Sequence, residues 1–365
     1  MKRSTRMLGV LLTCLLVPTA AVYAKAKPRF NARGNLLIAD RYNNRVIEID
    51  TNTQTIVWQY EMSVRNSVTN LIVGPCDAER VHSGTLIVGG GLPSGASTNY
   101  PGGASDNRVI LVNRKSRIIW QYGQAGVTGS GKDELNNPVA ALMLPHKRVL
   151  ITDQGNHRVI LVGHNKKIVW QYGTTGVSGS GTNLLNQPAG AQRLGNGHYL
   201  IADAGNNRVI EVTRKGTLVR QYGDPTDPTI LNGPTYVSRL PHTGNLLITD
   251  SLNNRIIEID RNNSNVFTYV TSARSGSATD PQPTRAIQLK KGSFLIADQF
   301  NHQVIEIDKS GAVVFTYGTL GVSGSADGFL NAPCDAKVIG DYTGLTSPHG
   351  SGGGGGFSLS FWSFF

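Results

Sequence analysis

Asp77, Glu79 and Asp335 are the residues of this chain whose types and positions could do chemistry together. Asp77 and Asp335 occupy the same place in two copies of one segment, PCDAERVHSGT from Pro75 and PCDAKVIGDYTG from Pro333. Carboxylate oxygens are the ligands that hard cations such as Ca²⁺ take in proteins. If the two copies lie side by side, these carboxylates could hold a Ca²⁺-like cation or a polar ligand.

Four further copies of this segment each begin with a proline, and the residue two places later differs from copy to copy. The six residues in question are Asp77, Ala140, Gly190, Tyr236, Arg285 and Asp335. The next position is Ala or Val throughout, which indicates packing. We therefore add Tyr236 and Arg285 to the predicted ligand site. The structural alternative is that Asp335 pairs with Arg285 while Asp77 is only hydrated, because charges often cluster for structural reasons.

Cys76 and Cys334 precede the two equivalent aspartates. In an oxidising compartment they could form a disulfide, which would close a long loop and contribute roughly 4 to 5 kcal/mol by the chain-entropy model. The alternative is a pair of small buried thiols that merely pack.

No catalytic residue is predicted. Seven of the eight histidines fall in predicted turns, and no repeated position supplies histidine from several copies. This distribution argues against a His-ligated metal site, so no cofactor is predicted beyond the Ca²⁺-like cation at Asp77 and Asp335.

These residues must be positioned by a repeat. Six segments share an apolar strand, a polar turn with Asn, and a β-branched strand that begins with Arg or Gln, as in LLIADRYNNRVIEID from Leu36. The markers are 47 to 63 residues apart: Arg45, Arg108, Arg158, Arg208, Arg255 and Gln303. An outer strand such as IVWQY follows each marker, and the proline segment precedes the next unit. A period of this length without helices predicts an all-β, six-bladed β-propeller of four-stranded antiparallel blades.

An Asp ends the strand before most markers, as Asp203 does before Arg208. Because the pair recurs with every blade, we interpret it as turn and inter-blade hydrogen bonding. The sixth marker is Gln303 instead of Arg, which indicates that this blade lacks the positive charge beside its Asp.

The first unit has no suitable innermost strand, since Pro28 falls where a ladder donor is needed. The segment from Pro333 supplies the missing strand at the far end of the chain. We expect this C-terminal strand to complete blade 1 and close the ring.

The Asp, Asn-His-Arg and Gly-rich connector pattern resembles NHL repeats. The resemblance covers roughly Gly34 to Gly344. It implies an NHL-type propeller but not a particular activity, since some proteins of this kind are amidating lyases and other six-bladed propellers are lactonases or streptogramin lyases.

Residues 1–24 have a basic start, an apolar run and a small-residue end, which predicts a signal peptide and a periplasmic, secreted or cell-surface protein. The propeller is assigned to residues 25–344. Residues 345–365 form a Gly-rich linker and a short apolar tail. The mature chain contains no predicted transmembrane helix.

The formal net charge is +11, and removal of the signal peptide leaves the chain basic. Export favours a protein, a glycan or another polyanionic surface as partner over nucleic acid. One insertion, residues 89–105, is confined to the second unit, and Tyr100 is its only aromatic residue, so we predict a partner contact there.

Two functions follow from these features. The first is a non-enzymatic binding scaffold for protein interactions. The second is a metal-dependent lyase or hydrolase at the mouth of the channel.

Overall fold

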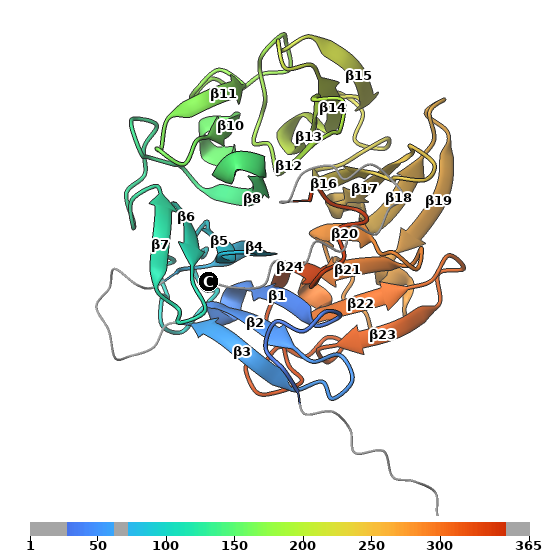
Figure 1. Ribbon diagram of the computed structural model, residues 1–365. Helices are drawn as coiled ribbons and strands as arrows, with labels where there is room; N and C mark the ends of the chain where they lie inside the picture. Colours follow the sequence, from blue (N-terminus) through green and yellow to red (C-terminus); the bar gives the residue numbers. More distant parts are fainter. Residues whose placement is uncertain (1–27, 62–71, 348–365) are drawn as a thin grey trace, which may run out of the picture.

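The computed structural model describes residues 28–61 and 72–347, which form a ring of six four-stranded antiparallel sheets (Figure 1). The predicted six-bladed all-β propeller is confirmed. The predicted signal peptide lies outside the described residues, as does most of the predicted tail. Within the described ranges, no helix is long and apolar enough to cross a membrane.

The strands of blades 1 to 3, ordered from the centre outward, are as follows. Blade 1 contains β24 (Pro333–Val338), β1 (Leu36–Asp40), β2 (Arg45–Ile49) and β3 (Ile56–Glu61). Blade 2 contains β4 (Pro75–Val81), β5 (Gly84–Gly89), β6 (Arg108–Val112) and β7 (Ile118–Tyr122). Blade 3 contains β8 (Pro138–Leu144), β9 (Arg148–Asp153), β10 (Arg158–Val162) and β11 (Ile168–Tyr172).

Blades 4 to 6 repeat this order. Blade 4 contains β12 (Gly190–Arg193), β13 (Tyr199–Asp203), β14 (Arg208–Val212) and β15 (Leu218–Gly223). Blade 5 contains β16 (Pro234–Arg239), β17 (Leu246–Asp250), β18 (Arg255–Ile259) and β19 (Asn265–Val270). Blade 6 contains β20 (Arg285–Gln288), β21 (Phe294–Asp298), β22 (Gln303–Ile307) and β23 (Val313–Tyr317).

Short 3₁₀ helices join the second and third strands in five blades. They are η1 (Arg41–Asn43), η4 (Gln154–Asn156), η5 (Ala204–Asn206), η6 (Ser251–Asn253) and η8 (Gln299–Asn301). Two others, η3 (Pro145–Lys147) and η7 (Thr271–Ala273), lie elsewhere in blade 3 and after β19.

The ring closes as predicted, with the last strand of the chain completing the first blade. β24 pairs antiparallel with β1, and Ala336 lies opposite Ile38. In Figure 1 the red β24 accordingly lies beside the blue β1. Residues almost three hundred positions apart in sequence thus share one sheet.

The hydrophobic core is divided among the six interfaces between neighbouring blades. Ile151 and Ile160 of blade 3 pack towards blade 2, whereas Leu150 and Val159 pack towards blade 4. This alternation follows from the two-residue period of a strand, and it explains why the central strands are apolar on both faces. Each such side chain stabilises the ring by about 1.5 to 3 kcal/mol.

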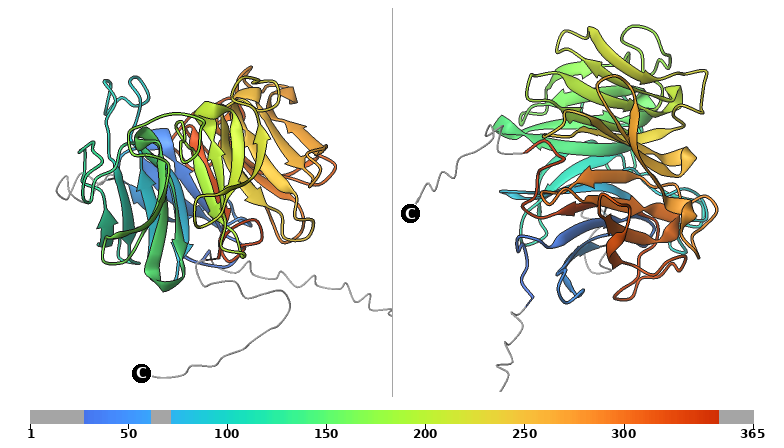
Figure 2. Two further views of the ribbon diagram at one scale, coloured as in Figure 1. Left: turned by 90° about the horizontal axis from the view of Figure 1, so that it is seen from above. Right: turned by 90° about the vertical axis from the view of Figure 1, so that its right-hand side faces the viewer.

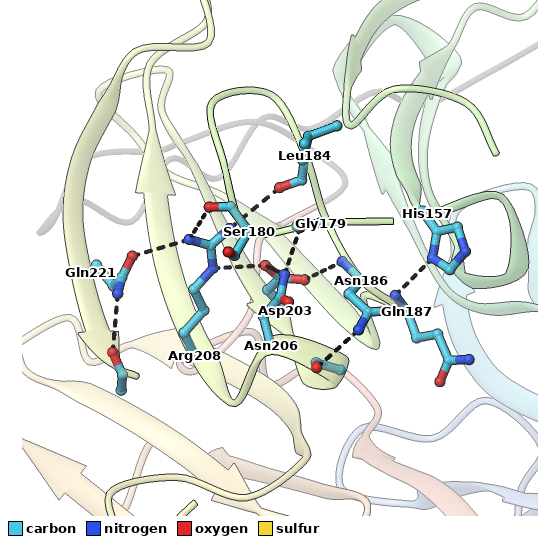
Figure 3. Close-up of polar contacts among 12 residues, drawn as sticks. His157, Gly179, Ser180, Leu184, Asn186, Gln187, Asp203, Asn206, Arg208 and Gln221 are labelled. Atoms are coloured by element: carbon cyan, nitrogen blue, oxygen red, sulfur yellow. Dashed lines mark hydrogen bonds and ion pairs between the residues drawn. The ribbon is translucent and has the colours of Figure 1, made fainter. Parts of the chain in front are cut away.

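One residue in each blade, just before the marker, has left-handed backbone geometry and joins its blade to the next. His157 has φ of 53°, and its Nδ1 accepts a hydrogen bond from the backbone N–H of Gln187 at 3.0 Å (Figure 3). Asn207 does the same with Oδ1 and the N–H of Gly233, at 2.9 Å. The full set of acceptors is Asn44, Asn107, His157, Asn207, Asn254 and His302. The residue directly before each marker is therefore an inter-blade link.

The recurring Asp and Arg serve the same purpose. Asp203 accepts hydrogen bonds from the N–H of Asn186 and from Asn206 and Arg208, and Arg208 in turn donates to the carbonyl of Ser180 in the preceding connector (Figure 3). These bonds hold the Gly-rich connector against the next blade.

Two blades achieve this pairing with residues from elsewhere in the chain. In blade 2 the position of the Asp is taken by Gly89, opposite Arg108, and the carboxylate comes from Asp106, 2.6 Å from Arg108. A Cβ on Gly89 would lie 2.6 Å from Cγ of Asp106, so the carboxylate occupies the space that the glycine leaves.

In blade 6, Arg274 from the preceding connector lies 2.6 Å from Asp298 and also donates to Gln303 at 3.0 Å. The interpretation that this blade lacks the cation is therefore wrong. The cation comes from another part of the chain.

After β24 the chain crosses the centre of the ring (Figures 1 and 2). Tyr342 donates to the carbonyl of Arg80 in blade 2 at 3.1 Å, and the N–H of Lys290 in blade 6 donates to Asp341 at 2.8 Å. Leu345 is buried, and Thr346 donates to the carbonyl of Arg193 in blade 4 at 2.9 Å. We call residues 339–347 the crossing segment.

Candidate functional site

The innermost strands of three neighbouring blades bring four charged side chains together near the ring axis. Arg285 of β20 lies 2.6 Å from Asp335 of β24 and 3.2 Å from Asp77 of β4. Lys337 of β24 contacts both carboxylates and donates to the carbonyl of Ala78 at 2.9 Å. We call Asp77, Arg285, Asp335 and Lys337 the central ionic cluster.

The cluster matches the structural alternative in one respect and departs from it in another. Asp335 pairs with Arg285 as that alternative required, but Asp77 is buried and paired with Arg285 and Lys337 instead of hydrated. Sequence reasoning missed Lys337. The signal was present, because Lys337 lies two residues after Asp335 and hence on the same side of its strand.

Lys337 lies between the two carboxylates where the sequence suggested a Ca²⁺-like cation. Its ammonium group contacts one oxygen of each aspartate. Burial alone would raise the pKa of Asp77, but the adjacent Arg285 and Lys337 outweigh it and hold that pKa well below its usual range. Two anions and two cations therefore compensate each other inside the ring.

The aspartates also protect open sheet edges. The N–H of Ala78 donates to Asp335 at 3.1 Å, and the N–H of Ala141 donates to Asp77 at 2.9 Å. Each carboxylate thus caps a backbone donor on the inner strand of the following blade, a donor that no further strand is there to bind. This is a structural role for the residues predicted to bind a ligand.

Tyr236 of β16 lies beside the cluster. The guanidinium carbon of Arg285 is 4.1 Å from the centroid of the Tyr236 ring, a cation–π contact. The Tyr236 hydroxyl and the hydroxyl of Ser238 are buried, and neither has a hydrogen-bonding partner among the described residues.

Glu79 is buried two residues after Asp77 on β4, on the same side of the strand. Its Oε2 accepts the N–H of Met143 at 2.8 Å, and its Oε1 is unpartnered among the described residues. Burial raises the pKa of Glu79 to about 8, although nearby Lys337 opposes the shift. The raised pKa favours the neutral form of Glu79, which lies beside a hollow also lined by Lys337, Tyr342 and Leu345.

Cys76 and Cys334 lie on the neighbouring inner strands β4 and β24 and are free thiols in this structure. Sγ of Cys76 donates to the carbonyl of Gly74 at 3.3 Å, and Cys334 and the guanidinium of Arg41 both lie close enough to Cys76 to lower the pKa of its thiol. The geometry thus brings the predicted pair together, and the disulfide itself stays a prediction.

The insertion in blade 2 is an ordered loop in which Leu92 bridges to Ala104 and Ser97 to Tyr100. Arg41 of blade 1 donates to the carbonyl of Gly91 at 3.1 Å, which fixes the base of the loop. The role of Tyr100 as a partner contact stays a prediction.

Charge is unequally distributed between the two ends of the blades. We call the turns between first and second and between third and fourth strands the turn end, and the opposite end, with the connectors, the connector end. In blades 2 to 6 the exposed cations at the turn end are Arg114, Lys115, Arg117, Lys147, Lys167, Arg214, Lys215, Arg261, Lys290, Lys291 and Lys309.

The connector end has the opposite character. Within the described ranges its exposed acidic residues include Asp224, Asp280 and Asp327, and Lys132 is its exposed cation. Sequence analysis gave the net charge but missed this separation, which appears only once the strand order assigns each turn to an end.

Solved structures with the same architecture include a protein of unknown function from Bacteroides caccae, with a TM-score of 0.55, 16% identity and coverage of 78% of this chain and 93% of that one. A streptogramin B lyase has a TM-score of 0.51 at 13% identity, covering 80% of each chain. Virginiamycin B lyase from Staphylococcus aureus has a TM-score of 0.51 at 11% identity, covering 81% of this chain and 84% of that one. At these identities the likeness shows the propeller fold alone. No family model and no curated protein matches the sequence.

Proposed function

We propose that this chain is an exported, non-enzymatic binding scaffold with NHL-type repeats, and that its turn end binds an extended polyanion such as an acidic polysaccharide. The observation that carries the proposal is the separation of charge, with exposed lysines and arginines in the turns of blades 2 to 6. Such a surface attracts anionic groups over a broad area and needs no deep pocket.

The arrangement at the ring axis favours a scaffold over the metal-dependent lyase or hydrolase. Catalysis by metal would require Asp77 and Asp335 to exchange Lys337 and Arg285 for a cation. Both carboxylates are buried and already compensated, so this exchange would leave two buried cations without partners. Metal content measured on the purified protein tests this alternative directly.

The binding proposal is tested with heparin as the polyanion and neutral dextran as its uncharged counterpart. We expect heparin affinity to fall steeply with salt and dextran not to bind, because counterions are released when a polyanion binds. The informative variant replaces Arg114, Lys115, Arg117, Arg214 and Lys215 with serine, and it should bind heparin at least tenfold more weakly.

A matched variant separates a specific face from net charge. Replacing Asp224, Asp280 and Asp327 with serine raises the net charge but leaves the turn end intact. If the proposal holds, this variant binds heparin about as the parent does. Affinity that is insensitive to salt, or that follows net charge in both variants, contradicts the proposal.

A further inference from the structure

Cys76 and Cys334 lie at the closure of the ring. Each is the second residue of its strand, β4 and β24, and these two strands are innermost neighbours in blades 2 and 1. Cys76 is buried, whereas Cys334 is partly exposed. A covalent bond between the two sulfurs would join the C-terminal closing strand directly to the next blade.

A fixed positive charge accompanies this thiol pair. Arg41 of η1 donates from Nε and Nη2 to the carbonyl of Gly91, at 3.3 and 3.1 Å, which holds its guanidinium in place. Among the described residues, Arg41 forms no ion pair with a carboxylate, unlike Arg45, which is paired with Asp40. A thiolate beside it would supply the missing negative charge.

The two thiols are not equivalent. The neighbouring Cys334 and the charge of Arg41 lower the pKa of the Cys76 thiol although burial opposes the change, and Cys76 Sγ donates to the carbonyl of Gly74 at 3.3 Å. The pKa of Cys334 is raised by the neighbouring Cys76 and by burial. The arrangement resembles other reactive dithiols in having one sulfur that is readily deprotonated and a second that can resolve a mixed disulfide.

We propose that Cys76, Cys334 and Arg41 form a redox site that reacts with small disulfides and locks the ring closed. In the first step a thiolate attacks a small disulfide R–S–S–R, forms a mixed disulfide and releases RS⁻. In the second, the other cysteine attacks the mixed disulfide, gives up its proton and releases the second R–S group as RSH. The two cysteines are oxidised, and the small disulfide is reduced to two thiols.

The test uses the full chain in a Cys14→Ser background, reduced and then exposed to oxidised glutathione. We expect the intact mass to fall by two hydrogen atoms and both free thiols to disappear together. Cys334→Ser and Cys76→Ser should each instead retain one bound glutathione. Two free thiols persisting in the folded protein, when the same reagent oxidises the unfolded chain, would overturn the proposal.

The role of Arg41 has its own measurement. Arg41→Met should slow alkylation of the thiol pair at pH 7 by about tenfold, because loss of one adjacent charge moves a thiol pKa by roughly one unit. Arg29→Met, which removes an exposed arginine outside the turn-end set, is the matched control and should leave the rate unchanged. A second readout is the pH dependence of thiolate absorbance in the protein that retains Arg41. If Cys76 ionises there at the pH of an ordinary cysteine, the role of Arg41 is refuted.

Discussion

At the scale of single residues, the link between blades depends on an acceptor atom in a left-handed backbone position. This position holds Asn in four blades and His in two, because Oδ1 of Asn and Nδ1 of a neutral imidazole can both accept the same backbone N–H. A protonated imidazole cannot, since both of its nitrogens then donate. The two histidine-containing links are therefore sensitive to acid in a way that the asparagine links are not.

This difference predicts that His302→Asn makes the protein more resistant to acid. Burial lowers the pKa of His302, so the folded state favours the neutral ring, and its contribution to stability is present above the unfolded pKa and lost as the pH falls through the folded one. The variant should keep about 1 kcal/mol that the parent loses between pH 7 and 5. Thermal unfolding measured across this range checks the prediction, and parallel curves for the two proteins would contradict it.

Glu79 predicts a dependence of the opposite sign. Because burial raises the pKa of Glu79 to about 8, its contribution to stability is complete below the unfolded value and is lost as the pH rises through about 8. Glu79→Gln keeps an acceptor for the N–H of Met143 without the ionisation. We expect denaturant unfolding at pH 9 to show the variant more stable than the parent, with little difference at pH 4, and equal stability at pH 9 would rule this out.

At the scale of elements, the blade motif needs a cation beside its aspartate but not from a fixed place in the sequence. Arg274→Gln should destabilise the protein by roughly 3 kcal/mol, because it leaves the buried Asp298 without its cationic partner and, among the described residues, with only the hydrogen bond from Asn301. Adding Gln303→Arg places an arginine at the marker position. In four other blades the arginine at this position pairs with the Asp that ends the second strand, so the added arginine should restore most of the lost stability. Chemical denaturation of the two single variants and the double variant measures the coupling between positions 274 and 303. If the effects of the two substitutions on the free energy of unfolding simply add, the two positions are not coupled.

The strands and turns of the blades were predictable because the same sequence pattern occurs six times. Alternating apolar residues, the Asn turn and the proline segment recur with enough regularity to locate the strands and the closing segment from Pro333. The exceptions were not predictable, because Asp106 and Arg274 reach their sites through loops whose paths the repeat does not determine. The repeated pattern predicts the strands and turns of its own blade. It does not predict which side chain of a connecting loop will pair with a residue of that blade.

At the scale of the whole molecule, the candidate site could be located from sequence but its chemistry could not. Comparing six equivalent positions identified Asp77, Arg285 and Asp335, since symmetry made the differing positions visible. It did not reveal Lys337, because that residue lies one position outside the comparison. Which charges compensate each other depends on distances across three blades, and only the closed ring defines those distances.

The central ionic cluster therefore predicts a large effect from a single change. Lys337→Met should cost about 3 to 5 kcal/mol, because two buried carboxylates would share Arg285 alone. Lys309→Met removes an exposed lysine from a turn and should change stability by less than about 0.5 kcal/mol. Equilibrium unfolding in urea compares the two, and similar stabilities would show that the cluster does not support the ring.

The crossing segment has a consequence for how the ring resists opening. Running from blade 1 at the turn end, it contacts blade 2 through Tyr342, blade 6 through Asp341 and blade 4 through Thr346. One stretch of backbone therefore fastens blade 1 to blade 4, which is not its neighbour, as well as to the two blades beside it. Separation of the closing strand from the first blade would have to break these distant contacts too.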